Sequence, residues 1–553
     1  MSRLTAALGL LSIVLMPGCS DREPGRSNDS SGVDPVRIET HMRALAADEF
    51  LGRETGSAGF MRAAEYVASA FADLGLEPAA QEAGFYQSVP LIAGSLLTDG
   101  SRLSLIRGGA EVSLEIQADF VIAPDLLRES SELTAPLVYV GFGVRAPTLE
   151  HDDYAGVDVR GKIAVMLDGA PDRFPHDVRA FHSKASMKQQ TAAQLGALGV
   201  VTLMLPRDRV NSPWNAVVAD HEVSAMRWLD PSGRPQGVQE ELFVAATLST
   251  TGEAKLFSGE ERTLEQVFAA AIAGETSSFD LAARLAAFTA TRHERLKSPN
   301  VIARLAGADA TVADEHVVLT AHLDHVGSIP VEAGQDGIYN GAYDNASGVA
   351  MLLEVARALA ERTERPRRSV LFVATTGEEK GLLGSEYFVE HPSIDLEDMV
   401  AEINLDVALM LHPLKDVVAF GAEHSSLGRT VELALREFGV KVSPDPIAEW
   451  GTFVRGDQYP FVEKGIPSIF LFSGFDAGQI DGVEQFQLWM SNIYHSPADD
   501  MDQTFDFKAG ADFARVVLRV VTDVADAGEQ PRWNAGDYFG NRFGNHRQDA
   551  TEP

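Results

Sequence analysis

Five short motifs of this chain carry histidine or carboxylate side chains, and these residue types hold divalent metal ions without sulfur. In chain order the motifs are Ala321-His322-Leu323-Asp324, Asn340-Gly341-Ala342-Tyr343-Asp344-Asn345-Ala346-Ser347-Gly348, Thr376-Gly377-Glu378-Glu379, Asn404-Leu405-Asp406 and Tyr494-His495-Ser496-Pro497. Cys19 is the single cysteine, so an internal disulfide and a cysteine-rich zinc site are both excluded. A metal ion would have to be held by His, Asp and Glu.

Three of the motifs directly follow apolar segments that we predict to be β-strands, at 316–321, 369–375 and 400–405. In an open α/β sheet, ligands bind beyond the carboxyl ends of the strands. Asp344 stands before a predicted helix instead. Each residue alone has an ordinary explanation, such as a buried histidine, a helix cap or a solvated turn. Together those explanations need five coincidences at one edge of a sheet, so the pattern favours a metal site.

The elements that must position these residues alternate as strand, loop and helix. Beyond the strands already named, 467–472 predicts a further strand, and 346–362 and 384–391 predict helices. Near the N-terminus, 36–50 and 58–74 carry apolar residues at helical spacing. This alternation is typical of an α/β fold with a mixed, largely parallel sheet and helices on both faces.

Residues 118–255 have a different texture and predict an inserted β-rich domain. Short apolar strands at 137–141, 162–167 and 199–205 are separated by Gly, Pro and Asp. Gly141-Phe142-Gly143 loosely resembles a dinucleotide-binding loop, but no helix pattern opens there, so we interpret it as a turn.

The whole chain then divides into six parts. They are a signal peptide at 1–19, a tether at 20–35, the two pieces of the α/β domain at 36–117 and 285–527, the inserted domain at 118–255 and a polar tail at 528–553. The length of 553 residues fits about two to four domains.

Charge and missing motifs exclude several classes of protein. The chain carries 80 acidic and 46 basic residues, a formal net charge of −34. Such an acidic surface repels phosphate backbones, so nucleic acid is not expected as a partner. The chain has no Gly-x-Ser-x-Gly elbow, which disfavours a serine hydrolase.

The N-terminus has the pattern of an export signal. Arg3 precedes an apolar run, 4–16, that is too short to span a bilayer. The following residues resemble a bacterial lipoprotein signal, in which cleavage exposes Cys19 for lipid attachment; an ordinary signal peptide cut nearby is the alternative. We expect an exported protein of the cell envelope, periplasmic or at the outer surface, anchored to the membrane by lipid on Cys19.

The five motifs, in this order, resemble those of the co-catalytic di-zinc aminopeptidase family, whose relatives include glutamate carboxypeptidase II, the transferrin receptor and glutaminyl cyclase. The resemblance covers roughly residues 37–117 and 285–527. The segment between them resembles the protease-associated domain that some members insert. It implies the zinc exopeptidase fold.

The resemblance also implies a site with two zinc ions. His322 and Asp406 would bind one ion, Glu379 and His495 the other, and Asp344 would bridge both. Oxygen and imidazole ligands suit zinc and tolerate manganese or cobalt.

Three further residues receive catalytic roles from the resemblance. Asp324 would accept a hydrogen bond from the second ring nitrogen of His322 and so fix its tautomer. Glu378 would act as general base. Tyr494 would donate to the developing oxyanion, or else pack beside His495.

Several activities remain open: an aminopeptidase, a carboxypeptidase of the glutamate carboxypeptidase type, a glutaminyl cyclase-like enzyme with one zinc ion, or a receptor-like relative without catalysis. Carboxylates hold the free ammonium of a peptide, whereas arginines hold its carboxylate. The motifs and the nearby loop supply Asp324, Glu378, Asp406 and Asp457, against Arg455 as the basic candidate. We therefore favour cleavage of N-terminal residues from peptides, although an arginine of the inserted domain could also contribute.

The remaining histidines receive no metal role. His325 is expected at the mouth of the site and not as a ligand. Five others have no matching spacing and are interpreted as structural or surface groups: His293, His316, His391, His412 and His424.

Overall fold

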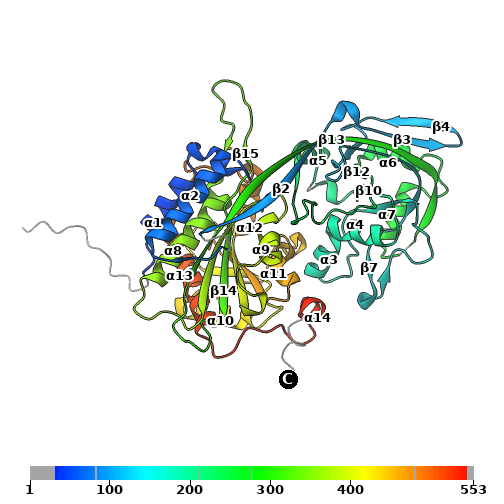
Figure 1. The fold of residues 1–553 in the computed structure, drawn as a ribbon. Helices are drawn as coiled ribbons and strands as arrows, with labels where there is room; N and C mark the ends of the chain where they lie inside the picture. The colour runs from blue at the N-terminus through cyan, green and yellow to red at the C-terminus, as the bar shows by residue number, and fades with distance from the viewer. Residues whose placement is uncertain (1–31, 81–83, 211, 276, 479–480, 545–553) are drawn as a thin grey trace, which may run out of the picture. The chain divides into compact units, whose positions relative to one another are not determined.

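Figure 1 shows the computed structural model, which describes residues 32–80, 84–210, 212–275, 277–478 and 481–544. The chain divides at Gly32, and the unit from Val33 onward is described below. The expected signal peptide, Cys19 and most of the tether lie outside the described residues. Within the described ranges, no helix is both long and apolar enough to cross a membrane.

Four parallel strands form the centre of the main sheet, and all of their residues are buried. In order across the sheet they are β17 (Ser369–Thr375), β14 (His316–His322), β18 (Met399–Leu405) and β21 (Ser468–Ser473). Antiparallel strands flank them: β13 (Phe279–Leu305) beside β17, and β19 (Asp416–Phe420) beside β21. The remaining strands of this sheet are β1 (Glu77–Pro78), β2 (Tyr86–Leu96), β11 (Ala225–Trp228) and β20 (Lys441–Val442). Uninterrupted apolar runs are typical of parallel strands covered on both faces.

Helices cover both faces of the main sheet (Figure 1). One face carries α1 (Pro35–Leu45), α2 (Ala58–Asp73), α8 (Gly348–Ala360) and α13 (Phe507–Asp526), with α10 (Leu427–Phe438) beside α13, and the other carries α9 (Leu383–Glu390) and α11 (Gln458–Glu463). Val317 belongs to the core of the first face, whereas its neighbour Val318 packs with Phe388 and Phe461 of the second. This alternation follows from strand geometry, which points successive side chains to opposite faces. The expected mixed, largely parallel sheet with helices on both faces is confirmed.

β13 is 27 residues long and runs through two sheets. Residues 279–290 pair with β6 (Ser130–Tyr139), and residues 291–301 pair with β2. One continuous strand therefore joins the inserted sheet to the main sheet, as the long green arrow in Figure 1 shows. The sequence pattern gave no indication of a strand of this length.

Three parallel strands form the centre of the inserted sheet, two of them at the expected segments 162–167 and 199–205 and the third overlapping the expected 137–141 only at its C-terminal end. They are β6, β9 (Ile163–Leu167) and β10 (Gly199–Leu203), followed by the parallel β12 (Ala245–Leu248) and the antiparallel β5 (Phe120–Ile122). The helices of the inserted segment are α3 (His176–Ser183), α4 (Ala185–Gln194), α5 (Trp214–Glu222), α6 (Thr250–Phe257) and α7 (Leu264–Ile272). Leu103 of β3 (Arg102–Arg107), which pairs with β4 (Ala110–Leu114), and Leu285 of β13 share its core. The packed inserted unit is thus wider than residues 118–255.

Three local boundaries differ from the sequence pattern. Helix α1 ends at Leu45 rather than near residue 50, because residues 48–53 turn with Leu51 and Gly52 at positive φ. Helix α8 begins at Gly348, after a separate wide helical turn at 342–347. The tail expected to be loose contains helix α14 (Tyr538–Phe543), which is held because Phe539 is fully buried.

Candidate metal centre

The carboxyl ends of three neighbouring strands place the first ligands at one edge of the main sheet. β14 ends at His322, β17 is followed by Glu378 and Glu379, and β18 is followed by Asp406. His322 pairs in register with the last residue of β17, so the strand ends meet. This is the arrangement that parallel strands give to the residues that follow them.

Asp344 and His495 reach the same edge from two other segments. Asp344 lies in the wide turn that precedes α8, and His495 follows α12 (Gly482–Asn492). The backbone N–H groups of Tyr343 and Asp344 donate to the buried carboxylate of Asp499, at 2.9 and 3.0 Å. Asp499 therefore fixes the turn that presents Asp344, and sequence reasoning had missed it although it lies four residues after His495.

The possible ligand atoms form two groups that share Asp344, each with its atoms within 4.8 Å of one another. The first group contains His322, Asp344 and Asp406. His322 Nε2 lies 3.2 Å from Asp344 Oδ1 and 3.0 Å from Asp406 Oδ1. The sharing of one carboxylate between two groups is the geometry that a two-metal centre needs.

The second group contains His325, Asp344, Glu379 and His495. His495 Nε2 lies 3.2 Å from Asp344 Oδ2 and 3.1 Å from Glu379 Oε2. The two groups together bring the five ligand residues expected from the sequence to one place.

His325 does not lie at the mouth of the site, so that expectation was wrong. Its side chain is fully buried, with Nδ1 2.8 Å from Glu379 Oε1 and 3.9 Å from Asp344 Oδ2. The residue turns inward because its backbone N–H donates to the carbonyl of Arg53, which holds the loop after β14 against the N-terminal segment. His325 is thus an additional imidazole at the second group.

Asp324 does not have the role that the sequence predicted for it. Its carboxylate does not contact the His322 ring: the backbone carbonyl of Asp324 lies 3.1 Å from His322 Nδ1 and sets that nitrogen as donor. The carboxylate instead accepts hydrogen bonds from the backbone N–H groups of Glu378 and Glu379, at 3.1 and 3.3 Å, and from Thr55 Oγ1 at 3.0 Å. Asp324 therefore holds the turn that carries Glu378 and Glu379.

Arg53 is a second buried support that the sequence pattern did not reveal. Its guanidinium donates to the carbonyls of Leu323, Leu45, Asn340 and Gly341. It thereby ties the N-terminal segment to the loops on either side of the metal groups. Burial lowers the pKa of Arg53 to about 10, against the opposing effect of the site carboxylates.

The site concentrates negative charge. Although burial opposes it, hydrogen bonds from His322 and His495 hold the pKa of Asp344 well below its usual value. Burial raises the pKa of Glu378 well above its usual value, and Asp406 raises it further while His322 acts in the opposite direction. Cations bound at the two groups would relieve this accumulation of buried carboxylates.

The donor set fits zinc. Every candidate ligand atom is a carboxylate oxygen or an imidazole nitrogen, which are zinc ligands in proteins. The side chain of Asp344 is 3% exposed and that of His495 is 36% exposed, so the centre is closed on its inner side and open near His495.

Tyr494 lies beside the open side of the centre. Its ring stacks on the His495 ring at a centroid distance of 3.8 Å. Burial raises the pKa of Tyr494 well above its usual value, and nearby Asp344 and Glu379 add to that effect. The hydroxyl therefore stays protonated and able to donate a hydrogen bond.

Two residues weighed in the sequence for substrate recognition lie in different environments. Asp457 is buried and accepts hydrogen bonds from Thr375 Oγ1 and Ser385 Oγ, both at 2.5 Å, so it supports the end of β17 and does not face a substrate. Arg455 is exposed.

A separate group of metal-binding residue types surrounds His424. Asp177, Glu423 and His424 lie together, and the His424 ring is 3.0 Å from Asp177 and 2.6 Å from Asp537. Burial opposes it, but hydrogen bonds to Asp177 and Asp537 raise the pKa of His424 to about 9. We interpret the group as an ion triad that links α3 and the start of α14 to the main domain.

Imidazole and carboxylate side chains that gather at the strand ends of an α/β sheet form a candidate zinc centre. Residues 300–521, which include all five motifs, match the model of peptidase family M28.

Relatives of the chain include both kinds of exopeptidase by name. "Probable glutamate carboxypeptidase VP8" of Zea mays is 28% identical over 527 residues, which cover 85% of this chain and 68% of that protein. "Aminopeptidase NAALADL1" of Mus musculus is 35% identical over 125 residues, which cover 21% of this chain and 15% of that protein. Most of the mouse protein thus lies outside the match.

A solved structure shares the fold. "Aminopeptidase from Aneurinibacillus sp. strain AM-1" is 20% identical, covers 91% of this chain and 96% of that chain, and gives a TM-score of 0.51. At this identity the likeness concerns the fold alone.

Proposed function

We propose that the protein binds two zinc ions per chain and hydrolyses N-terminal residues from peptides. The observation that carries the proposal is the shared carboxylate of Asp344, which lies between the groups around His322 and His495. Zinc ions held at these groups would polarise the scissile carbonyl and lower the pKa of an attacking water.

Within this proposal, Glu378 accepts and returns the proton. It lies next to Glu379 in the turn held by Asp324, and its carboxylate belongs to neither ligand group. A base in this position takes a proton from water at its carboxylate and gives it to the leaving amine. The Tyr494 hydroxyl donates a hydrogen bond to the oxygen on which negative charge develops.

The charge of the centre supports recognition of a free N-terminal ammonium. Arg53 is coupled to the site carboxylates, but it is buried and its guanidinium is already bonded to four carbonyls. Glu378 and Asp406 both remain partly exposed and can face a cationic group. Carboxyl oxygens accept hydrogen bonds from an ammonium, whereas an incoming carboxylate finds neither a donor nor a positive charge at these two side chains.

Aminoacyl-anilides test the direction of cleavage. We expect hydrolysis of the unblocked compounds and none of their N-acetylated forms, because acetylation removes the ammonium charge and leaves the scissile amide intact. Efficient hydrolysis of amino-blocked peptides with a free carboxyl end would reverse the assignment.

A carboxypeptidase is the second candidate, and Arg227 of β11 favours it. Gly381 lies in the turn that begins with Glu378. A Cβ placed on Gly381 would lie 4.0 Å from Arg227 Nη1, so the arginine side chain reaches this turn. Arginine side chains bind terminal carboxylates by paired hydrogen bonds. An Arg227→Gln variant that loses activity only on substrates with a free carboxyl end would support this candidate.

Metal content separates the hydrolytic reading from a one-zinc cyclase and from a receptor-like relative. We expect about two zinc ions per chain and loss of activity on chelation. One zinc ion in fully active protein would favour the cyclase.

We further propose export and lipid attachment at Cys19, which rest on the sequence pattern of residues 1–19. A Cys19→Ser variant is expected to remain an unprocessed precursor or to appear as soluble enzyme, whereas the wild type partitions with membranes. Wild-type protein that carries no lipid and begins at another residue would contradict the anchor.

A further inference from the structure

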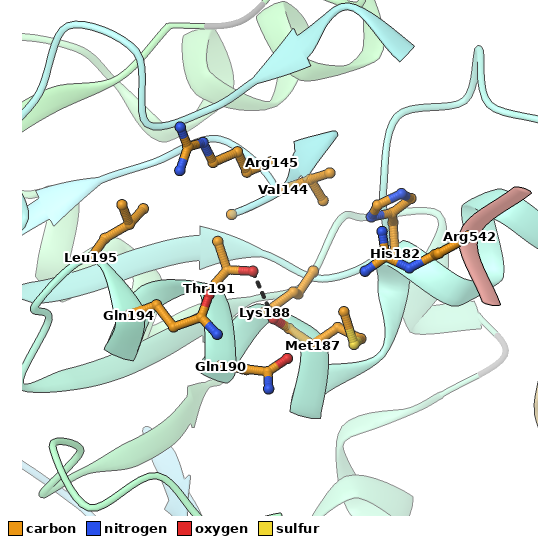
Figure 2. Close-up of a pocket in the computed structure, with 11 residues that line it drawn as sticks. Val144, Arg145, His182, Met187, Lys188, Gln190, Thr191, Gln194, Leu195 and Arg542 are labelled. Atoms are coloured by element: carbon orange, nitrogen blue, oxygen red, sulfur yellow. Dashed lines mark hydrogen bonds between the residues drawn. The ribbon is translucent and has the colours of Figure 1, made fainter. Parts of the chain in front are cut away.

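A cavity of about 300 Å³ is lined by the inserted domain and by Arg542 of α14, and it is separate from the metal groups. Figure 2 shows side chains of α4 on one wall, Val144 and Arg145 across from them, and His182 with Arg542 at one end. A cavity of this size lies at the lower end of the range for small-molecule sites. It suits one small molecule rather than a length of peptide.

The lining of this cavity has the opposite charge to the rest of the chain. Arg145, Lys188 and Arg542 line it, and none of the described lining residues is Asp or Glu. The chain as a whole carries a formal charge of −34. A concave site lined by one sign of charge concentrates ligands of the other sign.

Lys188 is the strongest indication that the cavity can bind an anion. Its side chain is buried, the residue being 4% exposed, and its ammonium donates one hydrogen bond, to the carbonyl of Leu167 at 2.7 Å. An ammonium has three donors. No described carboxylate lies within ion-pair distance of Lys188, although Asp168, Asp153 and Asp208 act on it from farther away. A buried charge with unfilled donors is costly unless an acceptor reaches it.

Two other cations at the cavity, Arg145 and Arg542, make only weak interactions with other side chains. Arg145 makes a solvent-exposed ion pair with Asp152 at 3.4 Å. Arg542 lies over the rings of Phe181 and Phe543 and has no ion-pair partner among the described carboxylates. Both guanidinium groups can therefore turn toward an anion.

The turn at Gly141-Phe142-Gly143, next to the cavity, does not have the free backbone N–H groups of a phosphate-binding loop. The backbone N–H groups of Phe142 and Val144, which would have to face a phosphate, both donate to Asp153 Oδ2, at 3.1 and 3.0 Å. The cavity also has apolar wall atoms from Val144, Met187 and Leu195. A ligand with a charged end and a short aliphatic body matches both features.

We propose that this cavity is a binding site for a small organic carboxylate, with the carboxylate received by Lys188 and Arg145 and the aliphatic body packed against Val144 and Leu195. None of these residues belongs to either metal group, so the site is distinct from the peptidase centre.

Calorimetric titration of the zinc-loaded full-length protein with glutarate tests the site. We expect saturable binding at one site per chain. An Arg145→Gln variant should weaken it by about tenfold, the loss of one charge-assisted hydrogen bond, and Lys188→Met by at least as much. Arg145 is half exposed, so the first variant leaves the fold unchanged and keeps the test valid if Lys188→Met does not fold.

Arg160→Gln is the matched control, because Arg160 is an exposed arginine of the same domain that does not line the cavity. It should bind glutarate as the wild type does. The proposal is overturned if the wild type shows no saturable glutarate binding, if Arg145→Gln binds glutarate as the wild type does, or if phosphate at equal ionic strength displaces glutarate at equal concentration.

Discussion

Replacement of Asp324 by Asn tests the support beneath the metal groups. The buried carboxylate accepts three hydrogen bonds, from the N–H groups of Glu378 and Glu379 and from Thr55. Asn has the same size but offers one acceptor oxygen in place of two, so its NH₂ group must face a donor. One buried backbone N–H loses its partner, which costs about 1–3 kcal/mol.

The loss falls on the turn that carries both Glu379, a candidate zinc ligand, and Glu378, the candidate base. Residues that support metal ligands typically contribute about 10–100-fold to metal affinity. We therefore expect Asp324→Asn to release zinc to a chelator at about 10–100-fold lower chelator concentration than the wild type. Metal content measured across a chelator series, together with turnover of an unblocked aminoacyl-anilide, gives both readouts.

Asp416→Asn is the matched control for this experiment. Asp416 is also a buried carboxylate that accepts two backbone N–H bonds, from Phe475 and Asp476, but it supports a turn without metal ligands. It should lose comparable thermal stability and keep wild-type zinc retention. The reasoning fails if Asp324→Asn holds zinc as tightly as the wild type, or if Asp416→Asn loses zinc equally.

Three further predictions concern Glu378, Asp344 and His424. Glu378→Gln should keep its zinc and lose about two to four orders of magnitude in turnover, and near-normal turnover would show that another group is the base. Asp344→Ala should lose both metal ions, measured as zinc per chain, because one carboxylate serves both groups; retention of one ion would argue against bridging. The pKa of His424 is about 9, against an ordinary value of 6.5. Its bonds to Asp177 and Asp537 therefore contribute their full stability to the fold below pH 6.5, and about 3 kcal/mol of that contribution is lost as the pH rises through 9. The melting temperature of the wild type should therefore fall toward that of His424→Gln over this pH range, and a gap that does not change with pH would contradict the charged triad.

The central strands could be predicted closely from the sequence. The expected segments 369–375 and 316–321 match β17 and all but the last residue of β14. Both are continuous apolar runs, and a parallel strand covered on two faces requires such a run. The long strand β13 was not predicted, because it passes from one sheet to another and its burial pattern changes along its length.

The candidate ligands could also be predicted, since their positions depend on local features. His322 and Asp406 come at the ends of apolar strands, and Asp344 comes just before a helix. Strand ends of a parallel sheet meet whatever the details of the loops, so residue type and order were sufficient to bring these side chains together.

The amino-acid sequence by itself thus determined the sheet, the ligand types and the edge at which they gather. Only the tertiary structure decided the supports: Arg53 bonds the carbonyl of Leu323, 270 positions away, and Asp499 bonds the backbone of Tyr343, 156 positions away. It also turned His325 inward and directed the carboxylate of Asp324 away from His322 and toward the Glu378 turn. These outcomes depend on which buried donors and acceptors meet once distant segments pack, and local periodicity carries no information on that.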